Sequence, residues 1–149
     1  MDGGLHAREW ITTATVSYML NEALEKYTAG DSEVTSIVDS LDLFFAPILN
    51  PDGYDYTWTD DRMWRKTRST SGAQCDDIRA RFGGGVDPNR NWDYMWARAD
   101  SHGYANDLAD TCSNVFAGPH AFSESEPFAV AEYVRARQNT SFARSIKQP

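Results

Sequence analysis

The sequence predicts a layered α/β fold on the basis of three patterns along the chain. Residues 10–28 carry a helical apolar stripe, residues 41–49 form a nearly continuous apolar run, and residues 123–138 again show a helical pattern. A short strand that is apolar on both faces is typical of a sheet covered by helices. With 149 residues, 41% of them hydrophobic, the chain is long enough for one domain with its own core.

The first predicted helix spans residues 10–28. Its apolar residues fall at offsets 0, 3, 4, 7, 8 and 11, which is the period of an α-helix: Val16, Met19, Leu20, Ala23, Leu24 and Tyr27. Glycine readily adopts the left-handed conformation that ends many helices. Gly30 is therefore predicted to end this helix.

The apolar run 41–49 predicts a buried strand, because it is short and rich in large apolar side chains. The tetrapeptide Asn50-Pro51-Asp52-Gly53 follows it and predicts a turn. Residues 57–86 and 98–122 are polar, with no convincing period, and are predicted as long loops.

The second predicted helix begins with a capping-box pattern, Ser123-x-x-Glu126. Pro127 is tolerated so close to the first turn. The apolar residues that follow continue one helical face to about Gln138, and residues 141–146 predict one more strand.

Composition narrows the class of protein. The net charge of −8 and the pI of about 4.7 argue against a nucleic-acid binder, which needs a basic face to neutralise phosphates. No apolar run approaches the roughly 20 residues of a membrane span. The start of the chain lacks the features of a signal peptide, while the cysteine pair and the sequon at Asn139, a weak pattern that counts only in a secreted chain, hint at secretion. A chain that lacks its natural beginning would reconcile the two. Two cysteines fit a disulfide without proving one.

Candidate chemistry begins at His6-x-x-Glu9. Imidazole and carboxylate are both zinc ligands, and the spacing suits a loop that enters a helix. Alone the motif is weak, since a surface histidine and a glutamate in the first helical turn would give the same pattern. Arg8, Arg65 and Arg90 stand beside aromatic or turn residues. A guanidinium grips carboxylates through two bonds, although a solvated basic segment explains such residues equally well.

Four blocks, in order, resemble the zinc carboxypeptidases of the A/B type, peptidase family M14. They are Leu5-His6-Ala7-Arg8-Glu9-Trp10-Ile11, Asn50-Pro51-Asp52-Gly53-Tyr54, Arg62-Met63-Trp64-Arg65-Lys66-Thr67-Arg68 and Asp87-Pro88-Asn89-Arg90-Asn91-Trp92. Each block is weak alone, but together they are highly specific and extend over nearly the whole chain. The resemblance implies a secreted α/β exopeptidase with a mixed sheet and flanking helices, which removes one C-terminal residue from a peptide or protein.

The resemblance also implies residue roles. His6 and Glu9 match the first two ligands of one zinc ion, and Arg65 matches the arginine that polarises the scissile carbonyl. Asn89 and Arg90 match the pair that grips the terminal carboxylate of the substrate. Arg8 matches a residue that binds the peptide further from its C-terminal end. Cys75 and Cys112 match the positions of a family disulfide.

The zinc site is expected to be incomplete. The resemblance implies a third ligand, a histidine, at the position of Lys147, and a protonated lysine is not a ligand. The family's general-base glutamate lies further along than residue 149. Residues 1–149 are therefore expected to form an incomplete catalytic domain with weak zinc binding and no useful turnover. Two alternatives remain open: a non-catalytic, peptide-binding or regulatory remnant that keeps the carboxylate clamp, and a structural α/β module with vestigial motifs.

Overall fold

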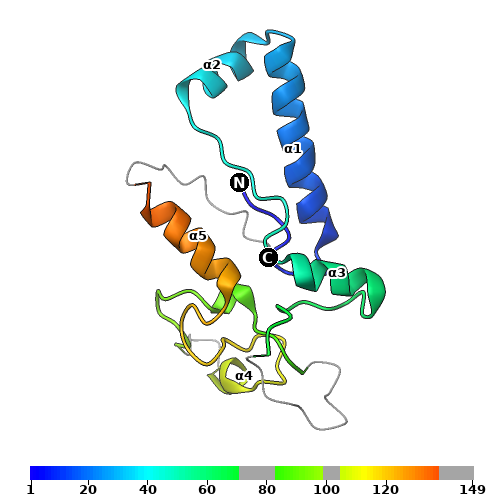
Figure 1. The fold of residues 1–149 in the computed structure, drawn as a ribbon, viewed down its shortest axis with the longest axis vertical. Coiled ribbons are helices and arrows are strands. Elements are labelled where there is room, and N and C mark those ends of the chain that lie inside the picture. The colour runs from blue at the N-terminus through cyan, green and yellow to red at the C-terminus, as the bar shows by residue number, and fades with distance from the viewer. Residues whose placement is uncertain (71–82, 99–104, 138–149) are drawn as a thin grey trace.

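The computed structural model describes residues 1–70, 83–98 and 105–137 (Figure 1). Its helices are α1 (Trp10–Thr28), α2 (Ser32–Ser40), α3 (Pro51–Thr59), the 3₁₀ helix η2 (Pro88–Arg90), α4 (Ala105–Ala109) and α5 (Ser125–Arg135). The molecule is elongated, with α1 and α2 packed together at one end and α4 near the other. The N-terminus lies near the middle, where the loop before α1 passes the start of α3.

The first predicted helix is confirmed as α1. Gly30 lies just beyond its end at φ 74°, and its N–H donates to the carbonyl of Tyr27 over 3.1 Å, as expected for a glycine that ends a helix. The apolar stripe, however, is mostly exposed. Val16 is buried at 5% exposure, whereas Leu24 is 59% exposed.

Helices α2 and α3 occupy positions that the sequence patterns did not assign to helix. Helix α2 begins after Asp31, whose side chain accepts hydrogen bonds from the backbone N–H groups of Glu33 and Val34. The tetrapeptide that predicted a turn instead starts α3. There Asn50 caps the helix by accepting from the N–H of Gly53 over 2.9 Å, and Pro51 occupies the first helical position. The turn prediction is therefore wrong for Pro51, Asp52 and Gly53, which are helical.

The predicted strand at residues 41–49 is extended but does not form a regular strand. A single parallel bridge joins Ala46 to Asp2. Around it, Ala46 N donates to Met1 O over 2.9 Å, and Gly3 N donates to Ala46 O over 3.0 Å. Within the described residues, segment 1–4 is the one extended neighbour, so no ladder of the predicted mixed sheet develops there. The described part of the chain is mostly helical rather than α/β.

The second predicted helix is confirmed as α5, with a different start. Glu124 is its N-cap residue and makes no side-chain cap bond, because its carboxylate instead accepts from the hydroxyl of Ser123 over 3.1 Å. The capping-box prediction at Ser123 is therefore wrong. Helix α4 lies inside the segment predicted as a long loop. The predicted strand at residues 141–146 lies outside the described residues.

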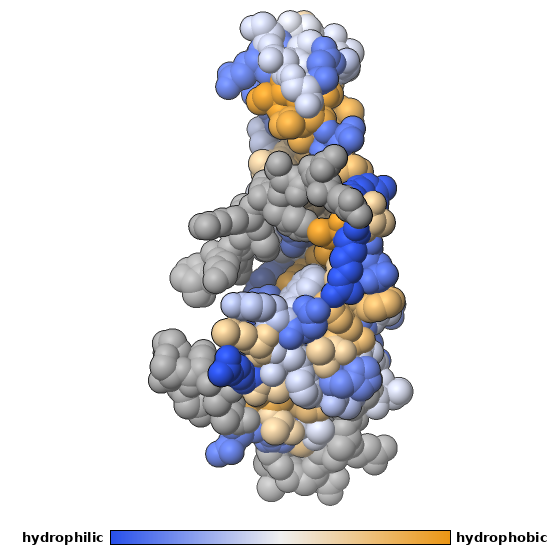
Figure 2. All heavy atoms as spheres, turned by 90° about the vertical axis from the view of Figure 1, so that its left-hand side faces the viewer, coloured by the Kyte–Doolittle hydropathy of each residue, from blue (hydrophilic) through white to orange (hydrophobic). Residues whose placement is uncertain are grey.

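The buried interior is strongly polar. Asn50, Asp87 and Asn91 are fully buried alongside the apolar residues Val86 and Ala117. Large apolar side chains of α1 and α2 remain exposed, and Figure 2 shows apolar surface toward the end of the molecule where these helices lie. None of the helices in the described ranges has the length and hydropathy to cross a membrane.

Candidate functional site

Three non-helical segments, near residues 5–9, 65–67 and 85–87, lie side by side and carry the candidate site. The N–H of Ala7 donates to the carbonyl of Arg65 over 3.1 Å, which joins the first two segments. The N–H of Thr67 donates to the carbonyl of Val86 over 2.9 Å, which joins the second and third. These bonds bring together side chains that are far apart in the sequence.

Asn50, the residue directly before α3, holds two of these segments. It is fully buried, and its side-chain amide donates to the carbonyl of Lys66 over 2.9 Å and to that of Leu5 over 3.4 Å. Because the same side chain caps α3, one residue couples the helix to two of the three site segments. The sequence pattern located Asn50 but gave it only a role in a turn.

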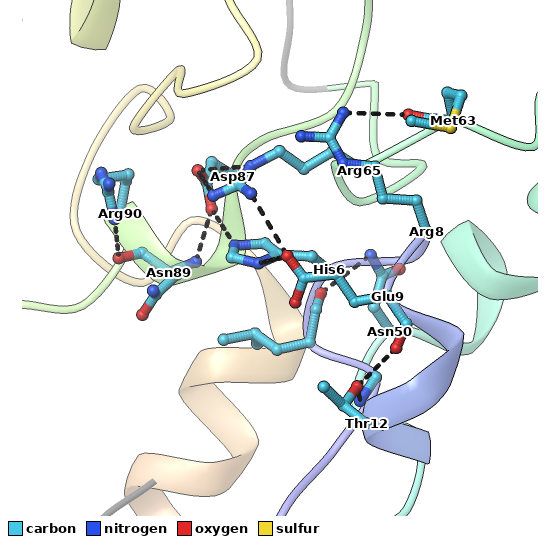
Figure 3. Close-up of polar contacts among 12 residues, drawn as sticks. His6, Arg8, Glu9, Thr12, Asn50, Met63, Arg65, Asp87, Asn89 and Arg90 are labelled. Atoms are coloured by element: carbon cyan, nitrogen blue, oxygen red, sulfur yellow. Dashed lines mark hydrogen bonds and ion pairs between the residues drawn. The ribbon is translucent and has the colours of Figure 1, made fainter. Parts of the chain in front are cut away.

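His6 and Glu9 approach each other directly (Figure 3). His6 Nδ1 lies 3.1 Å from Glu9 Oε1, and His6 is 8% exposed. Two ligands of one tetrahedral zinc ion lie roughly 3.3–3.5 Å apart, given bonds of about 2.0–2.2 Å. The predicted ligand pair therefore has a spacing that suits two corners of a zinc site.

Asp87 holds the other ring nitrogen of His6. Its Oδ1 lies 3.0 Å from His6 Nε2, so the ionised carboxylate favours the tautomer that carries its proton on Nε2. In that neutral tautomer the lone pair of Nδ1 faces the carboxylate of Glu9. Two acceptors in contact call for a proton or a cation between them. A carboxylate behind a histidine ligand is the usual support of protein zinc sites.

Asp87 is also the central acceptor of the site. Fully buried, it receives the Nε and Nη2 groups of Arg65 over 3.2 and 2.9 Å, and the backbone N–H of Asn89 over 2.9 Å. Burial raises the pKa of Asp87, but the hydrogen bond from His6 and the charge of Arg65 outweigh it and hold the pKa below its usual value. The sequence reasoning gave Asp87 no role. Its place before Pro88 in a turn-rich block was the available signal.

Arg65 lies between the two acidic groups. Besides its bonds to Asp87, its Nη1 is 3.7 Å from Glu9 Oε1, and its side chain is 14% exposed. The guanidinium is therefore fixed in place beside the His6–Glu9 pair while retaining access to solvent. The next residue, Lys66, turns the other way, and its buried ammonium donates to the carbonyl of Thr111 over 3.1 Å.

The predicted substrate residues lie around this centre rather than in it. Figure 3 places Asn89 and Arg90 on one side of His6 and Arg8 on the other. Asn89 and Arg90 belong to η2, and the side chain of Arg90 donates to the carbonyl of Asn89 over 3.2 Å. Arg8 donates to the carbonyl of Met63 over 3.4 Å. All three roles stay predictions.

The residues implied for the third zinc ligand and for the disulfide lie partly outside the described ranges, and Cys112 is disulfide-bonded. Lys147 and Cys75 lie outside the described residues, and Cys112 is buried at 8% exposure. Among the side chains that the structure describes, no group of three or more His, Cys, Asp or Glu residues is arranged to hold a metal ion. Asp87 does not complete the site, because it contacts the ring nitrogen of His6 that faces away from Glu9.

The chain is similar to several proteins of known class. The family model described as "Zinc carboxypeptidase" matches residues 1–147. Zinc carboxypeptidase A 1 of Anopheles gambiae is 42% identical over 90% of this chain and 27% of its own length. For carboxypeptidase B of Astacus astacus the identity is also 42%, over 85% of this chain and 36% of that protein.

Solved structures give the same result. The crystal structure of thrombin activatable fibrinolysis inhibitor matches with a TM-score of 0.69 and 34% identity, over 91% of this chain and 30% of that one. The carboxypeptidase A of Helicoverpa armigera matches with a TM-score of 0.64 and 32% identity, over 90% and 29%. The chain thus spans about a third of the length of these relatives.

Proposed function

The chain belongs to the zinc carboxypeptidase family, and on that premise we propose that residues 1–149 form part of a catalytic domain that binds zinc and the C-terminus of a peptide. One observation carries the proposal: His6 Nδ1 and Glu9 Oε1 lie 3.1 Å apart while Asp87 holds the opposite ring nitrogen. This arrangement presents a histidine lone pair and a carboxylate oxygen to one point. Secretion, expected from the resemblance, is part of the same proposal.

His6 and Glu9 would hold the zinc ion, which when bound polarises a carbonyl and lowers the pKa of a water molecule. Asp87 orients the His6 ring and keeps the proton on Nε2. Arg65 presents its guanidinium beside the pair, where a fixed positive charge stabilises the oxyanion that develops at the scissile carbonyl. Because Asp87 binds Nε and Nη2, the other amino group, Nη1, faces toward Glu9 and the site.

Asn89 and Arg90 would recognise the terminal carboxylate of the substrate. Both are exposed, and η2 carries them two and three residues after Asp87, the central acceptor of the site. A guanidinium that binds a free carboxylate would explain cleavage at chain ends only. Arg8, on the opposite side, would contact the peptide further from its end.

Titration of this chain with two short peptides tests the substrate class. The peptides share one sequence and differ in a free or an amidated C-terminus, and binding is followed by NMR. We expect the free carboxylate to bind more tightly, and Arg90→Ala to remove the difference. Arg98→Ala, which removes another exposed arginine, is the matched control and should leave the preference intact. Equal binding of both peptides by the native chain would refute the carboxylate clamp.

Calorimetry with zinc tests the metal pair. We expect weak binding that His6→Ala abolishes, because two ligands alone do not close a zinc site. Since a histidine is implied at position 147, Lys147→His should tighten the binding. Tight one-to-one binding by the native chain would show a further ligand and refute the expectation of an incomplete site.

We propose that the 149-residue chain alone does not release C-terminal residues from peptides, because Lys147 stands where the third ligand is implied. Zinc-dependent release by the purified chain would refute this. The alternative, a non-catalytic peptide-binding remnant, is favoured by the exposure of Asn89 and Arg90 next to, but apart from, the metal pair. Selective binding of free carboxylates in the presence of a chelator, with no turnover after zinc is restored, would support it.

A further inference from the structure

A buried carboxylate, that of Glu124, is hydrogen-bonded to Thr67, two residues along the chain from Arg65. Glu124 is 2% exposed, and its Oε2 accepts a short hydrogen bond of 2.5 Å from the hydroxyl of Thr67. Its Oε1 accepts from the hydroxyl of Ser123 over 3.1 Å. Within the described residues Glu124 has no basic partner, so both oxygens are satisfied by hydroxyl groups.

Burial of a carboxylate is costly, because solvation by water is lost and, among the residues that the structure describes, no opposite charge replaces it. A residue that merely anchored α5 could be apolar. The carboxylate is instead bonded to the one hydroxyl that also supports the site segments, which suggests a specific role for this acceptor.

Thr67 is the connection between Glu124 and the site. Its hydroxyl oxygen accepts the N–H of Val86 over 3.0 Å, and its own N–H donates to the carbonyl of Val86 over 2.9 Å. A hydroxyl has one proton. Donation of that proton to Glu124 turns the oxygen lone pairs toward Val86. Two bonds then hold Val86 against Thr67.

The geometry of this pairing sets the distance between two site residues. Arg65 lies two residues before Thr67, and Asp87 directly follows Val86. The Thr67–Val86 pair therefore fixes the register in which the guanidinium meets the carboxylate. At the other end, Glu124 is the N-cap of α5, which packs against η2, and its N–H donates to the side chain of Asn91 over 3.0 Å.

We propose that Glu124 is a positioning residue for Arg65: its carboxylate orients the Thr67 hydroxyl, and this holds the Arg65–Asp87 ion pair in register beside the metal pair. The inference deepens the proposed function, since it rests on Arg65 acting at that site. Glu124 itself touches neither metal ligand among the contacts recorded for it.

NMR of this chain, without zinc or peptide, tests the proposal through the Arg65 side chain. The Nε–H of Arg65 donates to Asp87, so its exchange with water reports how well the pair is held. We expect Glu124→Ala to speed this exchange by about tenfold or more, the factor that corresponds to the loss of one good hydrogen bond. Glu124→Gln keeps an acceptor for Thr67 and should stay within about threefold of the native rate.

Two controls separate positioning from general destabilisation. Glu126→Ala removes a half-buried acid from the same first turn of α5, away from Thr67, and should leave the Arg65 exchange rate unchanged. Backbone amides of α1 report global unfolding and should be unaffected in every variant. Thr67→Val should reproduce the effect of Glu124→Ala, and Thr67→Ser should restore the native rate.

An Arg65 exchange rate that is unchanged in Glu124→Ala would overturn the proposal. So would acceleration shared equally by the α1 amides, or equal acceleration in Glu126→Ala. If Glu124→Ala does not fold, the comparison of Thr67→Val with Thr67→Ser decides on the same criteria. Because the measurement involves no zinc and no peptide, its failure leaves the binding tests of the proposed function untouched.

Discussion

Replacement of Asp87 by asparagine is expected to destabilise the chain more than any other single change in the site. Asp87 is fully buried and accepts bonds from His6, Asn89 and, twice, from Arg65. The amide of asparagine keeps one oxygen, which can still accept from His6 and the Asn89 N–H. Its NH₂ group then faces the two N–H donors of Arg65, and both charge-assisted bonds are lost.

The magnitude follows from these two bonds. Hydrogen bonds to charged groups contribute about 1.5–3 kcal/mol each, and removal of one partner of a buried ion pair costs about 3–5 kcal/mol. We therefore expect Asp87→Asn to lower the free energy of unfolding by about 3–5 kcal/mol at pH 7. Asp93→Asn is the matched control. Asp93 pairs with Arg135 at the surface, with its side chain 57% exposed, so its loss should cost less than about 1 kcal/mol.

The pH dependence gives a second, independent check. Because the folded-state pKa of Asp87 is lowered, its carboxylate contributes stability above its ordinary pKa of about 4. That contribution is lost as the pH falls through the folded-state value. The difference in free energy of unfolding between the native chain and Asp87→Asn should thus be largest near pH 7 and shrink below about pH 4.

Urea unfolding at pH 7 and at pH 3 measures both quantities through linear extrapolation. The reasoning is refuted if Asp87→Asn costs less than about 1 kcal/mol at pH 7, or if the gap has the same size at pH 3. If the variant is already unfolded in buffer, its far-UV circular dichroism spectrum will lack the helical signal. The substitution has then cost at least the whole free energy of unfolding of the native chain. Arg65→Gln then tests the same ion pair from the other side.

Three further predictions concern residues around the site. Asn50→Ala should lower the free energy of unfolding by about 1–3 kcal/mol in urea titrations, because it removes the α3 cap and one of the two donors to the buried Lys66 carbonyl, the other being Trp64 Nε1; a loss under about 0.5 kcal/mol would contradict this. Gly85→Ala should destabilise in a thermal melt, since the residue has φ 67° and a new Cβ would lie 2.0 Å from the carbonyl oxygen of Thr67; an unchanged midpoint would count against it. Burial lowers the pKa of Lys66 to about 8, below its ordinary value. Between about pH 8 and 10.5 the unfolded chain therefore binds more protons than the folded chain, so the native chain should gain stability with rising pH relative to Lys66→Met. Parallel curves of stability against pH for the two proteins would exclude the lowered pKa.

The sequence predicted the local elements of the fold better than the long-range ones. α1 was evident because its apolar residues repeat at the helical period within a single segment. The capping roles of Asn50 and Asp31 were also local and could have been found from their position before Pro51 and before the 32–40 segment. The run at 41–49 misled because a strand depends on its neighbours, and one short segment pairs with it among the described residues.

The candidate site was predicted in its members but not in its organisation. His6, Glu9 and Arg65 were identified through the family resemblance, and the structure brings them together. Asp87, which joins them, was missed because its partner His6 is 81 residues away and no periodicity links the two. Glu124 was missed for the same reason, because it lies 57 positions after Thr67.

The separation in sequence between the partners of Asp87 has a consequence for folding kinetics. The His6 contact closes a loop of 81 residues, while the Arg65 contact closes one of 22. Loop closure becomes entropically harder with length, and contacts between distant segments slow folding. We therefore expect α1, α2 and the Arg65–Asp87 pair to form earlier than the His6–Asp87 contact. The metal pair should therefore acquire its geometry among the last steps of folding.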